Sequence, residues 1–106
     1  MKEIIFCKKN YMSYKDLYSQ IYRDLKGKNM PDWEDYDNLG YSGDILNEFL
    51  WYCHKDNNKY IFIGFDKDKI KLQKNYDDYK YNIVIEVFEN FVKEYPNNKL
   101  EFRMEE

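Results

Sequence analysis

The sequence predicts a small α/β protein in which a mainly parallel, three-stranded sheet is packed with helices. Runs of β-branched and aromatic residues at 3–7, 59–65 and 99–104 are typical of strands. Segments with apolar residues every three to four positions separate these runs and are typical of amphipathic helices. Strands joined through helices make crossover connections, which favour parallel pairing. Because 106 residues are enough for one core only, we expect residues 1–106 to form a single domain.

Two of the predicted helices have a clear apolar face. Residues 13–26 repeat Leu17, Ile21 and Leu25 at a spacing of four, which places all three on one side of a helix. Residues 82–95 carry an unbroken apolar stripe and end just before a proline, which is a natural helix stop. Both helices are therefore expected to cover the sheet.

A further helix is predicted over residues 39–53, and its start is weak. Gly40 and Gly43 each disfavour helix by roughly 1 kcal/mol. We therefore expect regular helix to begin only at Ser42 or Gly43.

The remaining segments are polar and predict irregular structure. Residues 29–38 include a proline and several acids, which is typical of a surface loop. Residues 66–69 predict a turn that leads to an additional short edge strand at 70–73. Residues 75–81 are polar and rich in tyrosine, and we expect no regular element there.

The sequence also bears on the compartment. No apolar run approaches the roughly 20 residues that cross a bilayer, so no membrane association is expected. The opening MKEIIFCKKN reads as a first strand rather than a secretion signal, which predicts a cytoplasmic protein. Cys7 and Cys53 are too few for a disulfide framework and are expected to be reduced.

Acidic residues are concentrated in one segment. The net charge is only −3, yet residues 29–54 contain six acids and no lysine or arginine. Such segregation predicts a surface that meets a positively charged partner. These acids are Asp32, Glu34, Asp35, Asp37, Asp44 and Glu48.

Aromatic residues lie among these acids. Trp33, Tyr36 and Tyr41 occur within the segment, and exposure of tryptophan is costly unless it serves a contact. Asp44 and Glu48 are four residues apart, so they share the face of the predicted helix opposite its apolar side. Aromatic and charged side chains together are typical of binding hot spots. The alternative is an ordinary solvated acidic loop.

Other chemistry has weak support. His54 directly follows Cys53, but adjacent helical residues point about 100° apart, so the two are not expected to act together. No metal-binding or phosphate-loop motif occurs, and no cofactor is expected. Lys67, Lys69 and Lys71 would share one face of a strand, as lysines that guard a sheet edge do, and direct nucleic-acid binding is not expected.

The central segment resembles the barstar family of ribonuclease inhibitors. The family's run of Pro-Asp-aromatic, a short gap, Asn-Leu, four residues, Asp, one residue and Leu has a counterpart here. The matching residues are Pro31, Asp32, Trp33, Asn38, Leu39, Asp44 and Leu46. Upstream, Asp16, Leu17 and Tyr18 resemble the opening of the family's first helix, and downstream Val84, Val87 and Phe88 resemble its final-helix core.

The resemblance implies a function. Barstar-like proteins insert their second helix and the preceding loop into the active site of a ribonuclease, where acidic side chains replace RNA phosphates. Asp44 matches the family's principal inhibitory aspartate, and Glu89 lies beside the position of its final-helix acid. Gly40 stands where the family often has an interface aspartate, and Gly43 where it has a tryptophan. These differences imply a different target.

The sequence thus predicts a non-catalytic immunity protein, monomeric when free, that binds a cognate basic nuclease toxin one to one. Two alternatives stay open: a small metal-dependent hydrolase using Asp32 and Asp44, and a regulatory interaction module. The residues predicted to bind the toxin are Asp32, Trp33, Asp35, Tyr36, Asp37, Tyr41, Asp44, Glu48 and Glu89.

Overall fold

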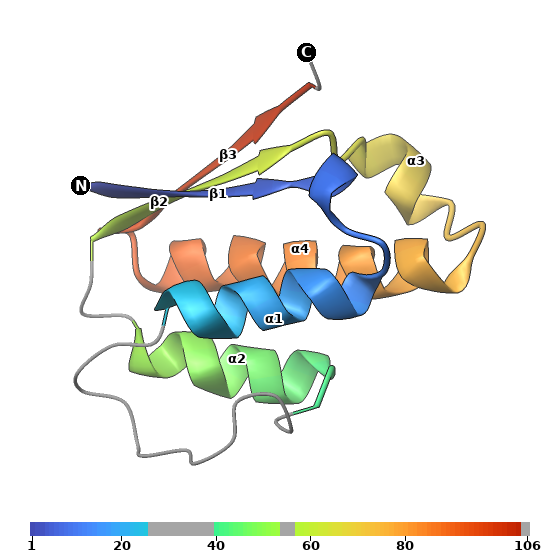
Figure 1. Ribbon diagram of the computed structural model, residues 1–106. Coiled ribbons are helices and arrows are strands. Elements are labelled where there is room, and N and C mark those ends of the chain that lie inside the picture. Colours follow the sequence, from blue (N-terminus) through green and yellow to red (C-terminus); the bar gives the residue numbers. More distant parts are fainter. Residues whose placement is uncertain (26–39, 54–56, 105–106) are drawn as a thin grey trace.

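The computed structural model describes residues 1–25, 40–53 and 57–104 (Figure 1). The predicted loop at 29–38 and His54 lie outside these residues. Within them, strands and helices alternate as the sequence predicts. The elements are β1 (Lys2–Cys7), the 3₁₀ turn η1 (Lys8–Asn10), α1 (Tyr14–Leu25), α2 (Gly43–Tyr52), β2 (Asn58–Ile63), α3 (Lys67–Lys71), α4 (Tyr76–Glu94) and β3 (Lys99–Arg103).

The three strands form an all-parallel sheet in the order β1-β2-β3. Tyr60 of β2 pairs in register with Ile4 of β1 and with Leu100 of β3. The predicted α/β class, the three main strands and their parallel direction are confirmed. The sequence did not specify the strand order, which places the most buried strand, β2, in the centre.

Helices α1 and α4 lie against one face of the sheet, and α2 lies on their far side (Figure 1). Aromatic rings fill the layer between sheet and helices. The ring of Phe88 on α4 lies 5.8 Å from that of Phe6 and 5.2 Å from that of Phe62, at tilted or edge-on angles that aromatic pairs prefer. All three side chains are fully buried. This core orders the helices over a single face.

The opposite face of the sheet carries no helix among the described residues (Figure 1). Ile5 of β1 is accordingly 48% exposed there. Its neighbour Ile61 on β2 is nevertheless fully buried. Glu101 of β3 also flanks Ile61 and forms ion pairs with Lys59, at 3.3 Å, and with Arg103. The stems of these long side chains can shield the central strand where no helix does.

The edge strand predicted at 70–73 is wrong, because the chain forms the short helix α3 (Lys67–Lys71) there. The carboxylate of Asp66 accepts hydrogen bonds from the backbone N–H groups of Asp68 and Lys69, which caps a helix start. Ile70 is the buried residue that anchors α3 to the core. Such a short segment has too few periods for its pattern to separate strand from helix.

Helix α4 is longer than predicted, since it begins at Tyr76 rather than at residue 82. The side-chain oxygen of Asn75 accepts a hydrogen bond from the backbone N–H of Asp78, at 2.8 Å, and caps the helix. Asp77 and Asp78 in the first turn interact favourably with the helix dipole. The polar residues at 75–81 thus form the first turns of α4 and not an irregular segment.

Helix α2 begins at Gly43, as predicted from its weak first turn. The hydroxyl of Ser42 accepts a hydrogen bond from the backbone N–H of Ile45, at 3.2 Å. Gly40 has φ +86°, a conformation that non-glycine residues rarely adopt. None of the helices in the described ranges combines the length and apolar character that crossing a membrane requires.

Candidate functional site

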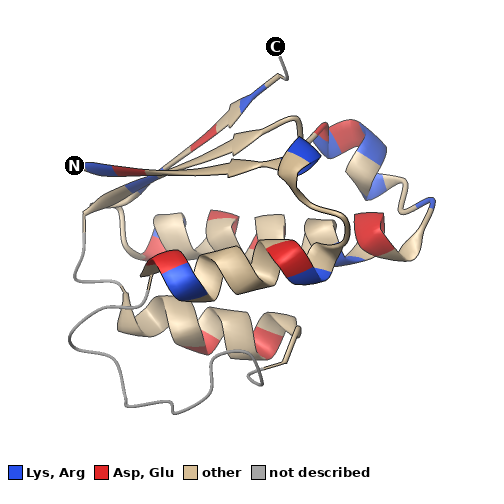
Figure 2. Ribbon diagram, in the orientation of Figure 1, with Lys and Arg blue, Asp and Glu red and all other residues tan. Residues whose placement is uncertain are grey.

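Helix α2 presents the two acidic residues of the predicted binding surface to solvent. Asp44 and Glu48 are both exposed, while Leu46, Phe49 and Leu50 on the other side of the helix are fully buried. The i, i+4 spacing puts the two carboxylates on one ridge. Figure 2 shows acidic residues and no basic residue along α2. The structure therefore brings Asp44 and Glu48 together, as the sequence predicts.

These two carboxylates are not neutralised by the described part of the chain. The ion pairs between described residues involve Asp24, Glu89 and Glu101, and none involves Asp44 or Glu48. Asp44 also lies in the first turn of α2, where the helix dipole favours a negative charge. Within residues 1–25, 40–53 and 57–104 the ridge has no ion-pair partner, so its field is directed toward solvent.

Tyr41 does not continue this ridge. It precedes α2 and packs its ring edge-on against Tyr14 and Tyr18 of α1, with centroids 5.9 and 5.7 Å away. Its backbone carbonyl oxygen accepts a hydrogen bond from the buried ammonium of Lys80. The ring and the carbonyl group of Tyr41 thus stabilise the segment that precedes α2. Only the exposed part of this side chain can contact a partner.

Gly43 permits the close approach of α2 to α4. A Cβ atom at this position would lie 2.8 Å from Cγ2 of Ile83, closer than real side-chain contacts allow. The side chain of Val87 lies next to it, at 3.8 Å. A larger residue at position 43 would therefore push α2 off α4. This packing explains physically why the chain has glycine at position 43.

Glu89 lies on α4, where it faces α3 rather than α2. Its carboxylate pairs with the ammonium of Lys67 at 3.5 Å, and that ammonium also lies 4.5 Å from the ring centre of Phe102. On α4, Ile83 and Val87 face α2, and Glu89 is two residues beyond Val87, about 200° around the helix. Glu89 is therefore not part of the ridge formed by Asp44 and Glu48.

The other predicted binding residues lie outside the described part of the chain. They are Asp32, Trp33, Asp35, Tyr36 and Asp37.

The described residues assemble no metal site. No group of three or more histidine, cysteine, aspartate or glutamate side chains lies close enough to hold a metal ion in the described ranges. Cys53 is buried, and its thiol contacts the backbone carbonyl oxygens of Leu25 and Phe49 at 3.4 and 3.5 Å. Cys53 thus contributes to packing at the end of α2 rather than to an exposed nucleophilic site.

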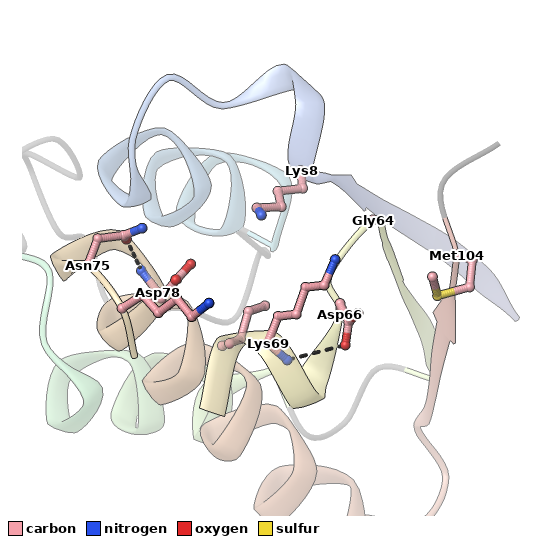
Figure 3. A pocket seen from close by; sticks show the side chains of 9 residues that line it. Lys8, Gly64, Asp66, Lys69, Asn75, Asp78 and Met104 are labelled. Atoms are coloured by element: carbon pink, nitrogen blue, oxygen red, sulfur yellow. Dashed lines mark hydrogen bonds between the residues drawn. The ribbon is translucent and has the colours of Figure 1, made fainter. Parts of the chain in front are cut away.

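A pocket of about 430 Å³ lies elsewhere, at the carboxyl ends of all three strands (Figure 3). Lys8 follows β1, Gly64 follows β2 and Met104 follows β3, and Lys69 of α3 reaches over the opening. Sequence analysis did not predict this pocket. Parallel strands bring their carboxyl ends to one edge, so the residue after each predicted strand was the signal that could have located it.

Comparison of the chain with known proteins gives no match: no family model, no curated protein and no solved structure is significantly similar to it.

Proposed function

We propose that this protein is an immunity protein of the barstar type, which binds a basic nuclease toxin one to one and blocks its active site. The acidic ridge of Asp44 and Glu48 on α2 would form part of the binding surface. Its carboxylates would take the place of substrate phosphates opposite the lysine, arginine and histidine side chains of a nuclease. Inhibition requires no catalysis by this chain, because occupying the site excludes RNA.

The observation that carries the proposal is that Asp44 and Glu48 are exposed and form no ion pair with any other described residue. Some described carboxylates elsewhere are paired, such as Glu101 with Lys59 and Glu89 with Lys67. Two acids on one ridge repel each other, which slightly lowers the stability of an isolated helix. A cationic partner would remove that repulsion and gain two charge-assisted hydrogen bonds.

The fold is compatible with the proposal. The barstar resemblance implies a small parallel sheet covered by helices, and the chain has this architecture. It also implies that the second helix meets the enzyme, and α2 lies on the side of the molecule away from the sheet (Figure 1). Such a helix can enter an active site without disturbing the core.

Asp44 and Glu89 are expected to contribute unequally to the affinity for the toxin. Asp44, at the match to the family's principal inhibitory aspartate, should dominate affinity. Glu89 would have to release Lys67 before it contacted a toxin, so its net contribution should be small.

Asp44→Ala tests the proposal against a candidate toxin, a basic nuclease domain sought among the products of neighbouring genes. We expect binding to weaken by about 2–5 kcal/mol, since an interface charge on the partner loses its counter-ion. The matched control is Asp68→Ala, because Asp68 is also an exposed aspartate in the first turn of a helix. Both variants lose the same interaction with a helix dipole, so the difference between them isolates the contact with the toxin.

Stopped-flow measurements of association complete this test. The association rate constant of the unmodified protein should fall steeply as salt rises, because exposed charges are screened beyond about 8–10 Å at 0.1–0.15 M. Equal affinities for the Asp44 and Asp68 variants, with a flat salt profile, would remove the ridge from toxin binding. Failure to inhibit any nuclease would remove the function itself.

A further inference from the structure

The pocket at the carboxyl ends of the strands lies where open α/β sheets bind their ligands. In such sheets, the loops after parallel strands diverge and leave a crevice at that edge. Here the backbone N–H of Gly64 after β2 donates a hydrogen bond to the carbonyl oxygen of Arg103 in β3, at 3.0 Å. This bond ties two strand ends together beneath the opening. The pocket volume of about 430 Å³ falls within the range of small-molecule sites.

Three lysines contribute to the pocket, and none of them has a described ion-pair partner. They are Lys8, Lys69 and Lys74, and they come from three different segments of the chain. None takes part in the ion pairs recorded between described side chains. In Figure 3 the side chains of Lys8 and Lys69 extend into the space between the end of β1 and α3. Two positively charged side chains therefore share the same space at the opening.

The two carboxylates beside the pocket do not cancel this charge. Asp66 already accepts hydrogen bonds from two backbone N–H groups at the start of α3. The three ammonium groups and two carboxylates leave the pocket lining with one net positive charge. The side-chain oxygen of Asn75 is used to cap α4, so its amide nitrogen is turned outward as a further donor. The pocket thus offers more donors than acceptors.

The helical conformation of α3 separates the roles of its lysines. Residues two apart on a helix point about 200° apart, so Lys69 faces the pocket while Lys67 faces the opposite side. Lys67 is engaged by Glu89 and by the ring of Phe102. If this segment were a strand, both would point the same way. The helical conformation of α3 therefore directs the charge of Lys69, and not that of Lys67, toward the pocket.

We propose that this pocket binds a small phosphate-bearing metabolite of nucleotide size. The phosphate would lie between the ammonium groups of Lys8 and Lys69, since lysine binds phosphate as a flexible point charge. Ile70 and Met104 line the same pocket and offer apolar contact to the rest of the molecule. This site is separate from the acidic ridge on α2, which lies on the other side of α1 and α4 (Figure 1).

A titration followed by ¹H–¹⁵N correlation spectra tests this site with inorganic phosphate, AMP and adenosine. Phosphate and AMP should cause saturable shifts of the amide signals of Gly64, Lys69 and Asn75, and adenosine should not. Lys8→Gln and Lys69→Gln should each weaken AMP binding about five- to tenfold, the effect of losing one charged contact. The matched control is Lys99→Gln, which removes an exposed lysine at the opposite end of β3.

Three results would overturn the proposal. These are shifts that rise linearly without saturation, shifts of equal size with sodium chloride at the same ionic strength, and equal weakening by Lys99→Gln. None of these results depends on nuclease inhibition, because Lys8 and Lys69 lie away from α2. Loss of the acidic-ridge function would likewise leave the phosphate titration unchanged.

Discussion

The ammonium of Lys80 donates a hydrogen bond to the backbone carbonyl oxygen of Tyr41, and this contact joins α4 to the residue two positions before α2. Lys80 is only 9% exposed. The rings of Tyr14, Tyr18 and Tyr76 surround its ammonium, with centroids 5.3, 5.8 and 6.0 Å away. A buried cation needs such partners, because burial removes its water. The contact therefore sets where the acidic helix starts.

Replacement of Lys80 by methionine should destabilise the protein. Lys80→Met keeps the length of the side chain but removes the hydrogen bond and the cation–π contacts, at a cost of about 1–3 kcal/mol. Urea unfolding followed by circular dichroism measures the change. The control, Lys93→Met, alters an exposed lysine on the same helix. Equal stabilities for the two variants would show that the Lys80 contact contributes nothing.

Two buried tyrosines of α1 should respond differently to loss of the hydroxyl group. In the described part of the structure, the hydroxyl of Tyr18 is buried without a hydrogen-bond partner, whereas that of Tyr22 donates to the carbonyl oxygen of Gly40 at 3.0 Å. Tyr22→Phe should cost about 0.5–1.5 kcal/mol, and Tyr18→Phe should be neutral or stabilising. Urea unfolding of the pair decides, and a larger loss for Tyr18→Phe would contradict this assignment.

The contact between Gly43 and Ile83 predicts non-additive stability changes. Gly43→Ala should cost about 1–3 kcal/mol through steric overlap, although alanine is the better helix former. Ile83→Ala removes the overlapping methyl group. The double variant should therefore lose about 1 kcal/mol less than the sum of the single variants. Additive losses in urea unfolding would show that the two residues do not meet.

Alkaline solution should unfold the protein as its buried tyrosines ionise. Burial, followed by the charge of Asp77, raises the pKa of Tyr81 from 10.0 to about 12. Burial also raises the pKa values of Tyr11, Tyr18 and Tyr22. Below pH 10 these phenols are protonated in both states, so their stabilisation is fully present. Above pH 10 the unfolded chain releases protons that the folded chain keeps, so stability falls as pH rises.

Urea midpoints between pH 9 and pH 12, recorded with phenolate absorbance, measure this effect. The midpoint should fall from about pH 10 upward, and the phenolate of the buried tyrosines should form together with unfolding. Tyr18→Phe should make the fall shallower, whereas Tyr79→Phe, at an exposed position, should not. Full ionisation of the tyrosines while the chain stays folded would be the contrary result.

The main features of the fold could be predicted because the segments with periodic apolar residues are long. The helix at 82–95 and the strand at 59–65 are stabilised by burial of their apolar residues. The spacing of those residues shows directly which positions are buried. The errors occurred where single side chains decide the local structure. Asp66 caps a helix of five residues, and Asn75 starts α4 six residues early. Such capping bonds are local contacts that apolar periodicity does not reveal.

The candidate site was predictable only in part, for a similar reason. The exposure of Asp44 and Glu48 follows from their spacing against the apolar face of α2. The core position of Tyr41 depends on Lys80, which is 39 residues away in the chain. The pairing of Glu89 depends on Lys67, which lies in a short helix where a turn was expected. Contacts between distant segments decide which charged residues stay free.

The common direction of the three strands has a practical consequence for anyone preparing this protein. Met1 precedes β1 at the amino end of the sheet, whereas Met104 borders the lysine-lined pocket at the carboxyl end. A purification tag or fluorophore attached on the carboxyl side of Met104 would start beside that opening and compete for it, most of all if the tag were acidic. Labels for solution work therefore belong on the amino terminus.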